Sequence, residues 1–191
     1  ESRIGRSGLS TQHPKVQIST KVATAPRDVW SSPDAYGRFL DEAIEGSRRR
    51  LGLSRLSLLQ LHQCDLPFLT SRSVAIALSR LLERGLCERI GISVYEPSEA
   101  LAALEIPAVS ALQVPISLLD RRFVTDELKA AYDKKTVLVI ARSVLLQGLL
   151  ADGAVLPIAK KQAALRQLKD RLETAAENTS LTLLALSYLF G

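Results

Sequence analysis

The sequence contains no methionine, and it has only two cysteines and two histidines among its 191 residues. Two cysteines, Cys64 and Cys87, are too few for the disulfide framework of a small secreted domain, and they fit a reducing cytoplasm. Because not even an initiator methionine is present, we expect either that the start of the protein was removed or that these residues belong to a longer chain.

Long apolar runs are also lacking. No run reaches the roughly 18 residues that a membrane span needs, and no basic-then-apolar leader opens the chain. The hydrophobic content of 47% and the charged content of 24% are ordinary for a globular protein. We therefore expect a cytoplasmic protein without a membrane partner, folded as a single domain over residues 1–191.

The net charge of +5 is a mild basic bias. Its clusters are short and lie near the ends of predicted helices or in turns: Arg48–Arg50, Arg121–Arg122, Lys134–Lys135 and Lys160–Lys161. Cations near a helix C-terminus are favoured by the helix dipole, whereas nucleic-acid binding concentrates positive charge on one face. A nucleic-acid partner is therefore the weakest hypothesis, and we expect none.

Apolar segments with the pattern of strands alternate along the chain with segments of helical periodicity. The predicted strands are Val16–Val22, Leu56–His62, Arg89–Tyr95, Val109–Ile116 and Val137–Ser143. The predicted helices are Pro33–Leu51 (closed by Gly52), Val74–Arg84 (stopped by Gly85), Pro97–Leu104, Asp120–Lys134, Lys160–Glu177 and Leu181–Phe190, with a helix cap near Asn178–Ser180.

Strict alternation of strand and helix predicts a parallel α/β sheet. Two architectures fit this order, a doubly wound open sheet and a (β/α)8 TIM barrel. No Gly-x-Gly-x-x-Gly follows any predicted strand, and no Walker-type phosphate loop is present, which favours the barrel.

Polar residues lie at or near the carboxyl end of every predicted strand. They are Lys21, His62, Ser93, Gln113 and the pair Arg142 and Ser143. In a barrel these ends share one rim, where catalytic residues lie. Each residue also has an ordinary structural interpretation, such as a solvated lysine or a core histidine, but their convergence favours a site.

Five segments in order resemble the aldo-keto reductase family. They are Ile18–Val22, Leu61–Asp65, Glu83–Ser93, Leu112–Pro115 and Ala141–Leu150, and they resemble that family's third to seventh barrel strands. The resemblance implies an incomplete (β/α)8 TIM barrel and the NADPH-dependent reduction of an aldehyde or ketone, a small-molecule substrate.

The resemblance also implies roles for individual residues. Lys21 matches the catalytic lysine, which would lower the pKa of a tyrosine acid, and His62 matches the histidine that orients the carbonyl. Ser93 and Gln113 would hold the nicotinamide carboxamide. Arg142 lies where many relatives place an aromatic ring against the nicotinamide. The pyrophosphate of NADP(H) would be lined by Ser143, Leu145, Gln147 and Gly148, and no metal is implied.

The sequence departs from the family at both ends. Glu1–Gly5 resembles the stretch just after the family's catalytic aspartate and tyrosine, and the segment that grips the adenosine phosphate is expected after Gly191. We therefore expect the 191 residues alone to be inactive. The alternative is a non-catalytic subunit of the same fold that binds NADP(H) and a protein partner. The substrate, the choice between NADP and NAD, and the oligomeric state stay open.

Overall fold

The computed structural model describes residues 1–13, 15–62, 64–153, 163–176 and 179–189. These residues form two compact units, Glu1–Val114 with Asp126–Ile140 (unit 1), and Pro115–Thr125 with Ala141–Gly191 (unit 2). The single domain expected from the sequence stays a prediction.

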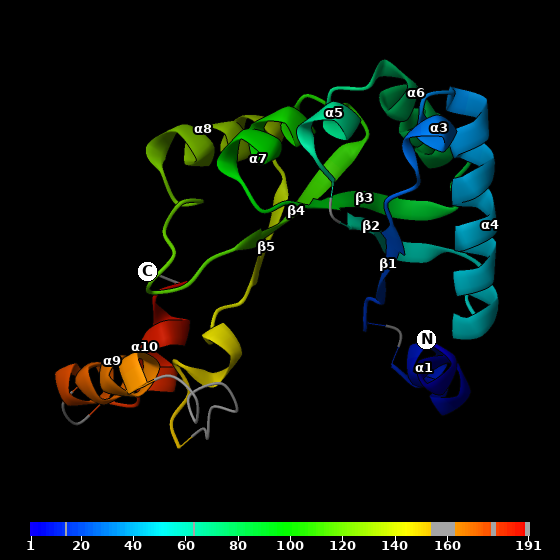
Figure 1. Ribbon diagram of the computed structural model, residues 1–191. Helices are drawn as coiled ribbons and strands as arrows, with labels where there is room; N and C mark the ends of the chain where they lie inside the picture. Colours follow the sequence, from blue (N-terminus) through cyan, green and yellow to red (C-terminus); the bar gives the residue numbers. More distant parts are fainter. Residues whose placement is uncertain (14, 63, 154–162, 177–178, 190–191) are drawn as a thin grey trace. The chain divides into compact units, whose positions relative to one another are not determined.

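Parallel strands form the centre of unit 1 (Figure 1). The strands are β1 Ser19–Ala23, β2 Leu56–His62, β3 Cys87–Ser93, β4 Val109–Pro115 and β5 Leu138–Arg142, in the order β1-β2-β3-β4-β5. The pairs β1–β2, β2–β3 and β3–β4 are parallel, as strand–helix alternation predicts.

Helices follow the strands in sequence. In unit 1 they are α1 Ser2–Ser7, α2 Leu9–Gln12, α3 Arg27–Trp30, α4 Pro33–Leu51, α5 Leu66–Leu69, α6 Arg72–Glu83, α7 Pro97–Leu104 and α8 Asp126–Lys135. In unit 2 they are the 3-10 turn η1 Leu146–Gly148, α9 Ala163–Ala175 and α10 Leu181–Ser187.

Helix α4 shows how local sequence sets these boundaries. The Ser32 side chain accepts a hydrogen bond from the Ala35 N–H, and Pro33 occupies the first turn, where its missing N–H has no helical partner. Gly52 ends the helix in the left-handed conformation at φ 70°. Tyr36, Leu40 and Ile44 form its buried face, as their spacing predicts.

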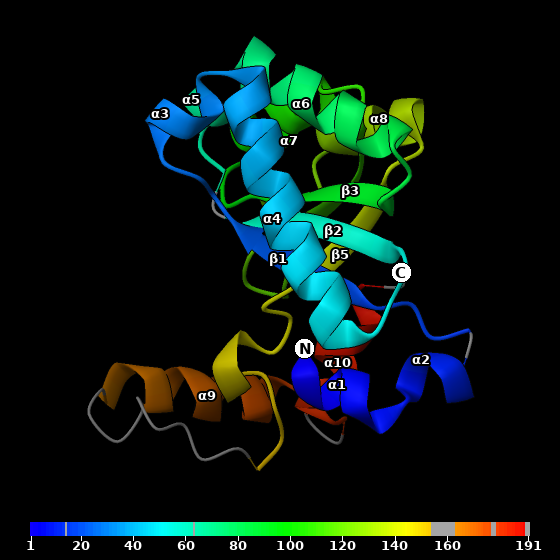
Figure 2. The same cartoon turned by 90° about the vertical axis from the view of Figure 1, so that its right-hand side faces the viewer.

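The helices cover one face of the sheet in unit 1. Figure 2 shows α4 facing the viewer with β1, β2 and β3 behind it. Thr20 and Val22 of β1 are buried, whereas Ser19, Lys21 and Ala23 alternate with them and are exposed. Since side chains alternate across a strand, Lys21 lies on the face of β1 that is not buried.

Several predicted boundaries are wrong. Strand β3 spans Cys87–Ser93 rather than Arg89–Tyr95, and other ends shift by one or two residues, such as the start of α6 at Arg72. Two larger differences have a structural reason. Strand β1 begins at Ser19, where pairing with Leu58 starts, and Val16 is exposed instead. Helix α8 begins at Asp126 rather than Asp120, because the Ser117 hydroxyl accepts the Asp120 N–H at 3.0 Å in a tight turn. Such local side-chain bonds compete with helix formation. The predicted helix Lys160–Glu177 is described as α9, and its ends, like Phe190, lie outside the described residues.

Two helical glycines offer a matched test of this packing. An added Cβ at Gly5 in α1 would lie 2.2 Å from the Arg50 backbone oxygen, whereas one at Gly37 in α4 would meet nothing within 4 Å. Gly5→Ala should lower the free energy of unfolding by about 1–3 kcal/mol through overpacking. Gly37→Ala should raise it by about 0.5–1 kcal/mol. Urea unfolding followed by circular dichroism checks both, and equal shifts for the two variants would contradict the close approach of α1 and α4.

Candidate active site

The carboxyl ends of four parallel strands carry a row of residues in unit 1. Pairing places Ala23 opposite His62, His62 opposite Ser93, and Ser93 opposite Gln113. Residues in register share one face of a sheet, and Lys21, two residues before Ala23, shares that face as well. The structure therefore brings together the four site residues that the sequence predicts for β1 to β4.

Gln113 is the centre of the polar contacts in this row. Its side-chain oxygen Oε1 accepts a hydrogen bond from the Lys21 ammonium and another, at 3.3 Å, from the Ser93 hydroxyl. Ser93 is buried, and Gln113 is half-buried. Lys21 and Ser93, from two strands that are far apart in the sequence, thus both donate to one amide oxygen.

His62 ends β2 and is half-buried. Its backbone carbonyl accepts a hydrogen bond from the Thr24 hydroxyl, which joins the end of β1 to the end of β2. Thr24 also bonds the Cys64 side chain, and burial raises the pKa of the Cys64 thiol to about 12. Cys64 is therefore a neutral, buried partner of the rim rather than a nucleophile.

A tightly packed layer lies beneath this row. Lys21 pairs with Gln60, and Gln60 pairs with Gly91 on the next strand. An added Cβ at Gly91 would lie 3.2 Å from the Ala111 Cβ and 3.4 Å from the Gln60 Cγ, so a larger side chain would have to displace its neighbours by a few tenths of an ångström. It gives His62, Ser93 and Gln113 a rigid support.

The remaining predicted site residues lie in unit 2. The Arg142 carbonyl accepts the Ile116 N–H at 3.1 Å, and Ser143 follows with φ 60°. Leu145 has φ −95° and ψ 6°, and Leu146, Gln147 and Gly148 have φ of 45°, 55° and 98°. Within the loop the Leu146 N–H donates to the Ser143 carbonyl and the Gly148 N–H donates to the Leu145 carbonyl, both at 2.9 Å, so tight turns accompany these conformations.

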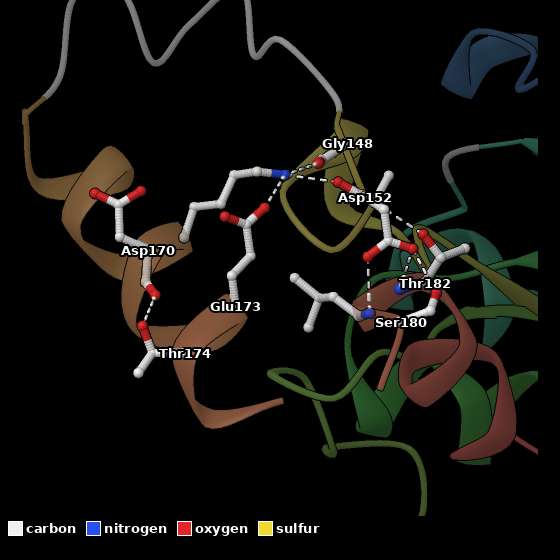
Figure 3. A network of polar contacts seen from close by, with 10 residues as sticks. Gly148, Asp152, Asp170, Glu173, Thr174, Ser180 and Thr182 are labelled. Atoms are coloured by element: carbon white, nitrogen blue, oxygen red, sulfur yellow. Dashed lines mark hydrogen bonds and ion pairs between the residues drawn. The ribbon is translucent and has the colours of Figure 1, made fainter. Parts of the chain in front are cut away.

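Polar side chains fix the segment that follows this loop (Figure 3). The Asp152 carboxylate accepts the Leu181 N–H at 2.8 Å and the Ser180 hydroxyl at the start of α10, and the Asp152 N–H donates to the Thr182 hydroxyl at 2.9 Å. The Ser180 side chain in turn accepts the Leu183 N–H, as the predicted cap near residues 178–180 requires.

Thr24 and Asp152 were not found by sequence reasoning. Thr24 follows a strand end, which is a usable signal, but its partner is the His62 carbonyl, 38 residues away. Asp152 reaches Leu181 across 29 residues. Contacts of that separation leave no local pattern in a sequence.

Comparison with known proteins agrees with this architecture. The model of the aldo/keto reductase family matches residues 1–191. The aldo-keto reductase AKR11C1 from Bacillus halodurans (holo form) is similar at 24% identity and a TM-score of 0.73, over 98% of this chain and 61% of its own. The glycerol dehydrogenase AKR11B4 from Gluconobacter oxydans is similar at 21% identity and a TM-score of 0.70, over 98% of this chain and 63% of its own.

A third structure is the aldo/keto reductase from Klebsiella pneumoniae in complex with NADP and acetate, with 22% identity and a TM-score of 0.64, over 98% of this chain and 60% of its own. The chain therefore spans about three-fifths of the length of these three structures.

The chain belongs to the aldo/keto reductase family. The sheet of parallel strands and following helices is the part of the (β/α)8 TIM barrel that the sequence predicted as strands three to seven. Within the part of the chain that the structure describes, no helix is long and apolar enough to cross a membrane.

The hydrogen bonds of the Asp152 carboxylate predict that the folded state loses stability in acid. Hydrogen bonds from Ser180 first, and from Thr182 and Leu181, hold the pKa of its carboxyl below the ordinary value of 3.8. The stabilisation is thus present in full above 3.8 and is lost as pH falls through the folded-state pKa. Thermal midpoints of wild type should drop more steeply below pH 3.8 than those of Asp152→Asn. A carboxyl that titrates at or above 3.8 by NMR would contradict this.

Proposed function

We propose that the whole protein is an NADP(H)-dependent oxidoreductase that reduces an aldehyde or ketone to an alcohol. The observation that carries this proposal is the convergence of the Lys21 ammonium and the Ser93 hydroxyl on the Gln113 side chain, in one row with His62. The backbone pairing of the strands does not by itself require a polar row of this kind.

The residues of the row fit a nicotinamide carboxamide. The Gln113 amide offers both an acceptor and donors, and Ser93 offers a hydroxyl that donates and accepts. A carboxamide presents the matching set. By family membership we propose that Ser93 and Gln113 hold this group and that Arg142 lies beside the ring.

The loop of unit 2 is the segment that family membership assigns to the pyrophosphate. Leu145 to Gly148 form a compact turn after β5. We propose that Ser143, Leu145, Gln147 and Gly148 line that group. The NADP complex of the Klebsiella pneumoniae structure supports NADP(H) as the cofactor.

Lys21 and His62 supply the proton chemistry in this proposal. The bound NADPH supplies a hydride to the carbonyl carbon, so negative charge develops on the carbonyl oxygen. A cation beside a proton donor lowers the pKa of that donor, which makes it an effective acid near neutral pH. We assign that cation to Lys21 and the orientation of the carbonyl to His62.

The first test removes the cation. In the full-length protein, Lys21→Met should lower kcat by about a hundredfold or more, while NADPH still quenches the protein fluorescence with a similar Kd. Lys15→Met, which replaces an exposed lysine ahead of β1, is the control and should leave kcat unchanged. Tight NADPH binding without turnover in the wild type would favour the non-catalytic subunit, and no quenching at all would contradict both functions.

The second test removes the acceptor. Gln113→Leu takes away the oxygen that both Lys21 and Ser93 bond, and it should raise the Kd for NADPH by about tenfold, since each lost hydrogen bond is worth about 0.5–1.5 kcal/mol. Fluorescence titration measures the Kd, with Ser110→Ala on the same strand as the control. An unchanged Kd would remove Gln113 from the cofactor site.

A further inference from the structure

Lys169 of α9 has an ammonium group with three oxygen partners. Its side chain is 13% exposed. Its ammonium donates to the Ala151 carbonyl at 2.6 Å and the Gly148 carbonyl at 3.4 Å, and it lies 3.4 Å from the Glu173 carboxylate (Figure 3). An ammonium has three N–H donors and no acceptor, so these three oxygens satisfy it.

Two of these oxygens belong to the loop rather than to the helix. The ion pair with Glu173 is an i,i+4 contact within α9, and such pairs contribute little by themselves. The carbonyls of Gly148 and Ala151 are 21 and 18 residues away in sequence. A partly buried charge directed at two loop carbonyls is not explained by the folding of α9 alone.

The loop itself needs outside support. Leu146 and Gln147 have positive φ of 45° and 55°, a conformation that is unfavourable for residues other than glycine. Such conformations persist where the surroundings determine them. Lys169 bonds the chain just after these residues, and Asp152 ties the next position to α10.

We infer that Lys169 is a positioning residue, held by Glu173, which fixes the Leu145–Gly148 backbone in the conformation that receives the cofactor's pyrophosphate. Its bonds to Gly148 and Ala151 add to the turns within the loop, where the Leu146 N–H donates to the Ser143 carbonyl and the Gly148 N–H donates to the Leu145 carbonyl, both at 2.9 Å. The inference deepens the proposed function and rests on it for the identity of the ligand.

The experiment combines two readouts on Lys169→Met, which keeps the length of the side chain and removes the ammonium. Hydrogen exchange of the amides from Gly148 to Ala151, measured without cofactor, should accelerate about tenfold. In the full-length protein the KM for NADPH should rise about tenfold while kcat at saturating NADPH stays within about twofold. A general loss of folded protein would instead lower kcat and leave KM unchanged.

Two further variants separate the effect of the Lys169 charge from the effect of any substitution on α9. Lys169→Arg keeps positive donors and should return both readouts most of the way to wild type. Arg166→Met removes an exposed cation one turn earlier on α9 and should change neither.

The outcomes distinguish the two proposals. Unchanged hydrogen exchange in Lys169→Met, or accelerated exchange with an unchanged KM for NADPH, would overturn the positioning role while wild-type NADPH binding stands. Failure of the wild type to bind NADPH would overturn the proposed function together with the cofactor role of Lys169. Accelerated exchange, a raised KM for NADPH and rescue by Lys169→Arg would together support the positioning role of Lys169.

Discussion

Parallel register is the constraint on which the site of unit 1 depends. Because β1 to β4 run in the same direction, their carboxyl ends lie at one edge, and pairing sets Ala23, His62, Ser93 and Gln113 side by side. A slip of one residue in any strand would turn its rim residue to the helix-covered face. The register is itself held by burial: Thr20, Val22, Leu59 and Leu61 alternate with the rim positions and are buried. The apolar face thus fixes where the polar face points.

The loop of unit 2 follows a different principle. No strand pairing sets its conformation, and several of its residues have left-handed backbones. Apolar packing offsets part of the free-energy cost of these left-handed residues, because Leu145 and Leu146 pack against the cluster of Leu150, Leu181 and Ala185. Polar contacts with Lys169 of α9 and between Asp152 and α10 also stabilise the loop. A loop determined from several sides can hold strained residues that a free loop would relax.

Local patterns account for what the sequence predicts well. Strand β2 and helix α7 have the predicted bounds, and α4 begins and ends where Pro33 and Gly52 predict. Errors occur where a side chain bonds nearby backbone, as Ser117 does ahead of α8. Short helices such as α3 and α5 are too brief for periodicity to show. The strand-end rule predicts that Lys21, His62, Ser93 and Gln113 lie together, as the register shows. It misses Thr24 and Lys169, because these side chains bond backbone carbonyls far away in sequence.

Burial decides which hydroxyl and thiol groups could serve as the proton donor of the proposed reaction. It raises the pKa of Tyr36 far above its ordinary range and that of Tyr132 to about 12. It also raises the pKa of the Cys64 and Cys87 thiols to about 12 and about 11. An acid that works near neutral pH needs a shift in the opposite direction. These four groups are therefore excluded as proton donors, whereas Lys21 lies exposed on β1, on the face that also carries His62.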